Sequence, residues 1–127
     1  EVQLLGGDGT HPRSTGNICT PGTHMVMEGD LIKQHCMNSS SKTYHGDQWV
    51  SIEVEVRGHA LMKCIMDGET IFTLTHPILD ESDPHAKTLI AANDGDARLT
   101  GGSISLQSES HPVEFRKVEL KPLPNDG

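Results

Sequence analysis

Polar and apolar residues alternate along several stretches of the chain, and the most informative stretch lies near its end. Over residues 103–111 the polar side chains fall on one side of an extended backbone, whereas Ile104 and Leu106 fall on the other. Pro112 has no N–H for a sheet ladder, so we expect a bend there before a second strand at residues 113–120. The pattern predicts two strands that meet at a polar corner. Its polar face is formed by Ser103, Ser105, Gln107, Glu109 and His111.

A second alternation covers residues 49–57. One side of this predicted strand is apolar and is expected to face a core, while the other side carries Trp49 and the carboxylates Glu53 and Glu55. The polar faces of both stretches have two interpretations: they are ordinary solvated surfaces, or they stack on a sugar and supply acid and base groups. The pattern alone leaves both open. The apolar side is formed by Val50, Ile52, Val54 and Val56.

The hairpin predicted at residues 61–75 has the strongest turn signal. Its strands, 61–66 and 70–75, are joined at Asp67-Gly68, a pair that tolerates the positive φ angles of a type I′ turn. Shorter strands are predicted at residues 1–5, near Ile18, at 23–27 and at 31–37, the last two joined by a turn at 28–30.

Segments rich in Gly, Pro, Ser and Asn separate these strands. Residues 6–22 and 38–47 are predicted loops, and residues 76–96 form a long connection with only a weak helical pattern near 83–92. Many short strands with such turns predict an all-β fold, a β-sandwich or jelly roll. A length of 127 residues suits a single domain with one core.

The charge balance narrows the range of partners. With 10 basic and 18 acidic residues spread along the chain, the formal net charge is -8, which argues against nucleic acid as a partner. No apolar run approaches the roughly 20 residues that cross a bilayer, so we expect no membrane span. Because residue 1 is Glu and not Met, and residues 1–5 already look like a strand, we expect the chain to begin inside a domain.

Three cysteines bear on the redox compartment. Cys19 and Cys36 flank the predicted strands at 23–37, and a bridge between them would stabilise the fold by roughly 3 kcal/mol in the chain-entropy model. We therefore expect a Cys19–Cys36 disulfide, with Cys64 left over. The alternative is three reduced, buried thiols in a cytoplasmic protein. Zinc binding by cysteine is disfavoured because the sequence has no CxxC pair.

Three stretches taken together resemble a known family. They are GDQWVSIEVEVRG at residues 46–58, the following hairpin with DGE at its turn, and above all GGSISLQSESHPVEFRKVEL at residues 101–120. These stretches are similar to the C-terminal part of the 3-keto-disaccharide hydrolase domain family, and the similarity extends from Glu1 to Leu120. Residues 1–127 are thus expected to form one domain of this type.

The resemblance implies a concanavalin-like jelly roll, a periplasmic or extracellular setting, and action on glycosides oxidised at C3 of the sugar. Domains of the family have several strands before the one that corresponds to residues 1–5. The resemblance therefore implies that the sheet has an open edge in this chain, which N-terminal strands of the family type or another chain would cover. The family also often has a His near the position of Cys64 in this sequence.

The implied chemistry begins with the ketone, which acidifies the neighbouring C2 proton so that a base can remove it. The C1 substituent is then expelled, and water can add back. If the three outward-facing strand sides share one sheet, His111 or Glu53 is the base, and Glu109 is the acid or an orienting group. The sugar would be bound by Glu1, Gln3, Trp49 and Gln107, with the glutamines as hydroxyl partners and the tryptophan as a stacking platform.

Two alternatives remain. The first is a carbohydrate-binding module without catalysis, although Trp49 and Tyr44 are the only Trp and Tyr available for stacking. The second concerns cofactors: we expect none, but a divalent metal that polarises the ketone is the alternative. The residue types that bind Zn or Mn, without tight spacing, are His24, His35 and His111 together with Glu1.

Overall fold

The computed structural model describes residues 1–124, which form two antiparallel sheets and one helix. The smaller sheet has three strands in the order β1-β2-β5. The short strands expected at residues 1–5 and near Ile18 are confirmed as its first two members. The bounds of its strands are β1 Val2–Leu4, β2 Gly16–Cys19 and β5 Cys36–Asn38.

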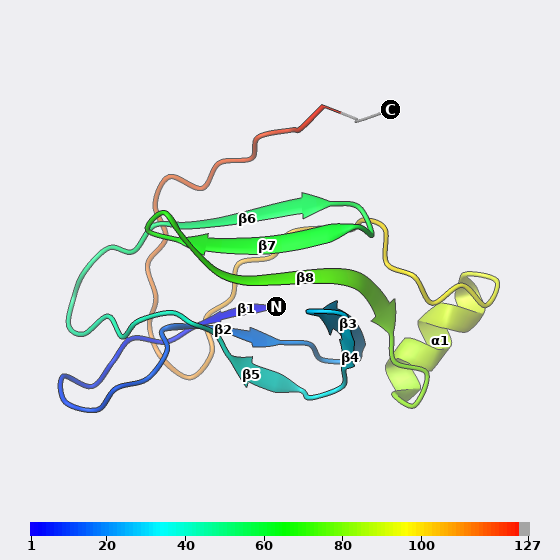
Figure 1. Cartoon of the computed structure of the whole chain (residues 1–127), viewed down its shortest axis with the longest axis horizontal. Coiled ribbons are helices and arrows are strands. Elements are labelled where there is room, and N and C mark those ends of the chain that lie inside the picture. Colours follow the sequence, from blue (N-terminus) through cyan, green and yellow to red (C-terminus); the bar gives the residue numbers. More distant parts are fainter. Residues whose placement is uncertain (125–127) are drawn as a thin grey trace.

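The larger sheet has five strands in the order β4-β3-β8-β7-β6, so β4 and β6 are its edges. Figure 1 shows β6, β7 and β8 lying above β1, β2 and β5, with the helix at one end. The predicted all-β class is confirmed as a mostly β architecture consistent with a β-sandwich. The bounds are β3 Thr23–Met27, β4 Asp30–Ile32, β6 Ile52–Arg57, β7 Leu61–Met66 and β8 Glu69–Leu79.

The core lies between the two sheets. Alternation along β7 and β8 points one set of side chains inward, and their register places Cys64 opposite Phe72 and Met62 opposite Leu74. Ile18 of β2 meets these side chains from the other sheet. The buried cluster consists of Ile18, Met25, Tyr44, Cys64, Met66, Ile71, Phe72 and Leu74.

Two turn predictions are confirmed. Asp67 and Gly68 have φ values of 47° and 83° between β7 and β8, as a type I′ turn requires. Glu28 and Gly29 take the same left-handed region between β3 and β4, with φ of 50° and 85°. The strand predicted at 31–37 is wrong in its extent, since β4 ends at Ile32 and residues 36–38 join the other sheet.

The long connection predicted at residues 76–96 is more structured than its polarity suggested. β8 continues to Leu79, and helix α1 spans Pro84–Ala92, where only a weak helical pattern was seen. Asp83 caps the helix by accepting a hydrogen bond from the Ala86 N–H at 2.8 Å, and Pro84 provides a preset first helical residue. A cap and a proline at the start stabilise the helix despite its small apolar face.

The two strands predicted at residues 103–111 and 113–120 are absent from the structure, and this is the largest correction. Residues 101–124 are extended and exposed, with no strand assigned among them. The alternation fixes which side chains share a face, but a strand forms only where a neighbouring strand accepts its backbone hydrogen bonds. The large apolar side chains left exposed are Ile104, Leu106, Val113, Phe115, Val118, Leu120 and Leu123.

The prediction that one whole side of β6 faces a core is also only half right. Val50 and Ile52 pack against the buried cluster, whereas Val54 and Val56 are 46% and 53% exposed. The smaller sheet packs over β7 and β8, so the apolar side of the edge strand β6 is uncovered over its second half.

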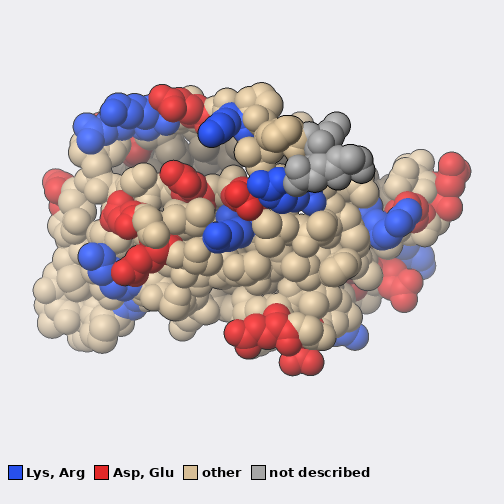
Figure 2. All heavy atoms as spheres, turned by 45° about the horizontal axis from the view of Figure 1, so that its top comes forward, with Lys and Arg blue, Asp and Glu red and all other residues tan. Residues whose placement is uncertain are grey.

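The cysteine prediction is confirmed. Cys19 and Cys36 are opposite each other on β2 and β5 and form a disulfide, while Cys64 is a buried free thiol. Such a bridge is typical of an oxidising compartment. Within residues 1–124, no helix is long and apolar enough to cross a membrane. On the side that carries β6, acidic and basic side chains are interspersed (Figure 2).

Candidate functional site

A row of three carboxamides crosses the outer face of the smaller sheet. Gln3 is opposite Asn17 in the β1–β2 pair, and Asn17 is opposite Asn38 in the β2–β5 pair. Directly opposed residues point to the same side of a sheet. Because Ile18 points into the core, its neighbour Asn17 must point outward, and the other two carboxamides point outward with it.

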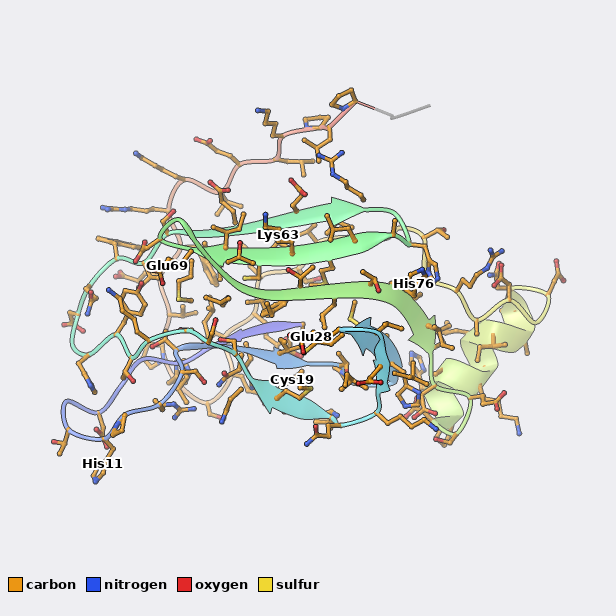
Figure 3. All side chains as sticks on the ribbon, in the orientation of Figure 1. His11, Cys19, Glu28, Lys63, Glu69 and His76 are labelled. Carbon is orange, nitrogen blue, oxygen red and sulfur yellow. A yellow bond between two sulfur atoms is a disulfide. The ribbon has the colours of Figure 1, made fainter. Side chains whose placement is uncertain are left out.

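The row lies in a hollow of about 500 Å³ that is open to solvent. The Cys19–Cys36 bridge fixes the two strands beneath it, and Figure 3 labels Cys19 on the sheet concerned. Apart from Arg13, Cys36 and Met37, the residues of the lining carry neutral carboxamide side chains. The lining residues are Gln3, Arg13, Asn17, Gln34, Cys36, Met37 and Asn38.

Asn17 holds the floor of the hollow in place. Its Oδ1 accepts hydrogen bonds from the Ser14 hydroxyl and, at 3.1 Å, from the Ser39 backbone N–H. Its Nδ2 donates to the Ser14 carbonyl at 3.1 Å. Both ends of this carboxamide are therefore engaged in joining the chain segments around the sheet, so Asn17 is a structural member of the row.

Gln34 and Asn38 differ from Asn17 in this respect. Within residues 1–124, neither of their side-chain amides has a hydrogen-bond partner, and both residues are exposed. A carboxamide offers two N–H donors and a carbonyl acceptor. These two residues can therefore exchange water for the hydroxyl groups of a ligand without breaking a bond within the protein.

Arg13 lies at the rim of the hollow on a clamped backbone. Its N–H donates to the Thr43 hydroxyl at 2.7 Å, and the same hydroxyl donates to the Arg13 carbonyl. This reciprocal pair ties residues 30 positions apart in the chain. The base of the Arg13 side chain is thus held in place, and Arg13 is one of the residues that line the hollow.

The comparison with known families decides the identity of the domain. A family model for the 3-keto-alpha-glucoside-1,2-lyase-like domain matches residues 1–121. The chain belongs to this family. Comparisons with curated proteins and with solved structures found no match. The resemblance inferred from residues 46–58 and 101–120 is therefore confirmed, and the domain is one of a sugar-acting family.

The lyase-like domain does not bring its predicted site residues together. The expectation that their strands share one sheet is wrong, because Gln3 is in the smaller sheet and Glu53 is on β6 in the larger one. Gln3 lines the hollow, and Glu1 precedes it on the same side of the chain with its carbonyl accepting a hydrogen bond from the Cys19 N–H at 3.0 Å. Glu53 and Glu1 are both exposed.

The other predicted residues lie on or beside the exposed final segment of the lyase-like domain. Trp49 is 50% exposed, and the Arg116 guanidinium carbon lies 4.0 Å from the centre of its ring. This stacking joins the final segment to the start of β6. His111 is held locally, since the Ser108 hydroxyl donates to its carbonyl at 2.6 Å. Gln107 and Glu109 lie on the same exposed segment, outside either sheet.

The four residues considered for a divalent metal are not assembled. His24 of β3 lies 3.4 Å from Asp80, measured from Nε2 to Oδ2, and both side chains are largely buried. His35 precedes β5 and His111 is on the final segment, so they do not complete a set with His24. Among the described residues, no group of three His, Cys, Asp or Glu side chains is placed to hold a metal ion.

Sequence reasoning missed Arg13, Asn17, Gln34 and Asn38 because none of them lies on the polar strand faces that it considered as a site. One signal could have found two of them. A disulfide between Cys19 and Cys36 on antiparallel strands sets the register. Asn17 is two residues before Cys19 and Asn38 is two residues after Cys36, so the same register pairs Asn17 with Asn38. Arg13 had no such signal, since its position depends on loop contacts.

Proposed function

We propose that this lyase-like domain acts on 3-keto-glycosides and that the hollow on its smaller sheet binds the sugar. The observation that carries the proposal is the set of free carboxamides in the hollow, Gln34 and Asn38, beside Gln3. Sugar hydroxyls both donate and accept hydrogen bonds, and carboxamides match them in both roles. Family membership supports a sugar as the ligand and a ketone at C3 as its reactive group.

The reaction would begin with removal of the C2 proton, which the C3 ketone acidifies. The C2–H electron pair then forms the C1–C2 double bond, and the C1 substituent leaves with its bonding electrons and takes up a proton from an acid. Addition of water across the resulting enone would complete a hydrolysis. A positioned base and acid each contribute about 10²- to 10⁴-fold in such reactions.

The base and the acid have to come from outside the lining of the hollow, which contains no carboxylate and no imidazole. The proposed base is His111 or Glu53, and the proposed acid or orienting group is Glu109. The placement of Glu53 in the opposite sheet favours His111. Gln107 and Gln3 remain the proposed hydroxyl partners, Trp49 a stacking platform and Glu1 a further substrate contact.

The complete fold is proposed to be a concanavalin-like jelly roll with an additional layer over β6 and residues 101–124. The exposed side chains of Val54 and Val56, together with the unpaired final segment, support such a cover. N-terminal strands of the family type, or another chain, would provide it. A periplasmic or extracellular setting is proposed on the basis of the Cys19–Cys36 disulfide.

The binding step is tested by titrating the protein with methyl 3-keto-α-glucoside while recording amide NMR spectra. The proposal expects shifts that centre on Gln34 and Asn38 and are lost in Asn38→Ala. The matched control is Gln48→Ala, because Gln48 is an exposed carboxamide outside the hollow. Shifts centred elsewhere, or equal loss of binding in the control, would contradict the hollow as the sugar site.

A carbohydrate-binding module without catalysis is the second candidate, and the absence of a carboxylate or imidazole from the lining favours it. Release of the aglycone from a chromogenic 3-keto-glycoside separates the two candidates. An enzyme releases the aglycone with turnover, whereas a module gives the same binding shifts and no release.

A further inference from the structure

Among the described residues 1–124, Arg13 is the only charged residue that lines the hollow. It stands out because the chain as a whole is acidic, with 18 acidic and 10 basic residues. We propose that the sugar bound in the hollow carries an anionic group, a carboxylate or a sulfate ester, and that Arg13 binds it. The inference rests on the proposed function, because it concerns the substrate class of the same hollow.

Comparison with the other arginines supports this role. Arg98 pairs with Asp96 at 3.0 Å, and Arg57 lies 3.4 Å from Glu55. Arg116 stacks on the ring of Trp49. In the described part of the chain, Arg13 has neither a carboxylate within ion-pair distance nor an aromatic ring beneath it. Among the arginines of the described residues, Arg13 is therefore the one whose guanidinium is available to a ligand.

Contacts within the fold also hold the Arg13 backbone in place. The Thr43 hydroxyl bonds to both its N–H and its carbonyl, and Ser14, the next residue, bonds to Asn17 of the floor. Holding the backbone in this way removes the backbone entropy that ordering this segment would otherwise cost on binding a ligand. The Arg13 side chain therefore starts from a fixed point at the edge of a surface that already carries amide groups for hydroxyls.

The chemistry of the lining divides the ligand into two parts. Gln34 and Asn38 suit neutral hydroxyls, because each amide can both donate and accept hydrogen bonds. A guanidinium presents parallel N–H donors that fit two oxygens of a carboxylate or a sulfate. Because the hollow is open to water, the pair is expected to improve affinity by about twofold to fivefold.

The test compares the affinities of three probes by isothermal titration or NMR: methyl α-glucoside, methyl α-glucuronide and methyl α-glucoside 6-sulfate. Wild-type protein should bind at least one of the charged sugars about twofold to fivefold more tightly than the neutral one. Arg13→Gln should remove that preference and leave the neutral sugar unchanged. Arg13→Lys should restore only part of it, since an ammonium lacks the paired donors. The control Lys87→Gln removes the same charge from an exposed position on α1 and should have no effect.

The two charged probes distinguish the source of the anion, because preference for the glucuronide assigns a uronic acid and preference for the sulfate assigns a sulfated sugar. Equal affinity for all three probes in the hollow would overturn the inference while leaving the proposed function intact. Equal competition by inorganic sulfate alone would also overturn it, since the site would then bind an anion without a sugar. Binding of no probe would overturn this inference, whereas the proposed function is decided by the separate titration with methyl 3-keto-α-glucoside.

Discussion

The Tyr44 hydroxyl and the Asp67 carboxylate form a hydrogen bond that joins the loop before β6 to the β7–β8 turn. Asp67 also accepts a hydrogen bond from the Ser51 N–H at 2.9 Å, and the Tyr44 N–H donates to the Thr15 hydroxyl at 2.8 Å. The hydrogen bond from Tyr44, followed by that from Ser51, lowers the pKa of Asp67. The same hydrogen bond to Asp67 is the largest cause that raises the pKa of Tyr44 to about 12.

This contact predicts how stability depends on pH. Because the pKa of Asp67 is lowered in the folded state, its contribution is present above the ordinary value of 3.8 and is lost as pH falls through the lowered value. The raised pKa of Tyr44 acts in the opposite direction: its contribution is present below pH 10 and is lost as pH rises towards 12.

Tyr44→Phe removes the shared hydrogen bond and should lower the urea midpoint at pH 7. It should also abolish the loss of stability at high pH, because the tyrosine hydroxyl is gone, and reduce the loss at low pH, because Asp67 then keeps the Ser51 N–H but not the Tyr44 hydroxyl. Urea unfolding at pH 3, 7 and 11 checks this. A variant with the same pH profile as the wild type would show that the contact is not made in solution.

The cysteines should differ sharply in reactivity. Burial raises the pKa of the Cys64 thiol to about 11, so the native protein should show no thiol that reacts with an aromatic disulfide reagent at pH 8. Denaturation without reductant should expose one thiol. Mass spectrometry of a non-reduced digest should recover Cys19 linked to Cys36, and a linked peptide that contains Cys64 would contradict this assignment.

Removing the bridge tests its energetic role. The double variant Cys19→Ser/Cys36→Ser should lose about 3 kcal/mol of the free energy of unfolding, because the open chain gains loop entropy in the unfolded state. Denaturant unfolding measures the loss, with reduced wild-type protein as the comparison. A loss well under 1 kcal/mol would indicate that the β2–β5 pairing does not depend on the bridge.

The identity of the catalytic base can be decided with two exposed residues. The two variants to compare are His111→Ala and Glu53→Gln. The variant that removes the base should lower turnover of a 3-keto-glycoside by about 10²- to 10⁴-fold. Turnover by the other variant should stay within a few-fold of the wild-type value. Neither should change stability much, because both side chains are exposed. Thermal melts run beside the kinetics provide that control, and unchanged turnover in both variants would exclude both residues as the base.

The uncovered edge of the larger sheet should cause this chain to associate. Val54 and Val56 present an apolar surface beside the free backbone groups of β6, and exposed edges of this kind pair with other strands. Sedimentation should show association that increases with concentration and decreases in Val54→Lys. The matched control is Glu53→Lys, on the opposite side of the same strand. A monodisperse monomer at high concentration would refute the expectation.

Local patterns were sufficient wherever neighbours in the sequence are also neighbours in space. The β7–β8 hairpin follows from the Asp67-Gly68 turn between two alternating segments, and both strands and turn were predicted from the sequence. The pairing of Cys19 with Cys36 followed in the same way, from two cysteines that flank a short excursion of the chain.

The candidate site depended on distant contacts that period-2 alternation cannot encode. Alternation determines which residues share a face, but not which strand lies beside that face. Residues 101–124 show this limit, because their pattern predicts strands and the structure gives them no partner. The hollow shows the opposite case, in which long-range contacts create a site that no local pattern indicates. Arg13 is held beside it by Thr43, and Gln3 and Asn38 share one face because β2 lies between their strands. The sequence by itself determined the β7–β8 hairpin, its turn and the Cys19–Cys36 bridge, whereas long-range pairing in the tertiary structure decided which polar faces became a site.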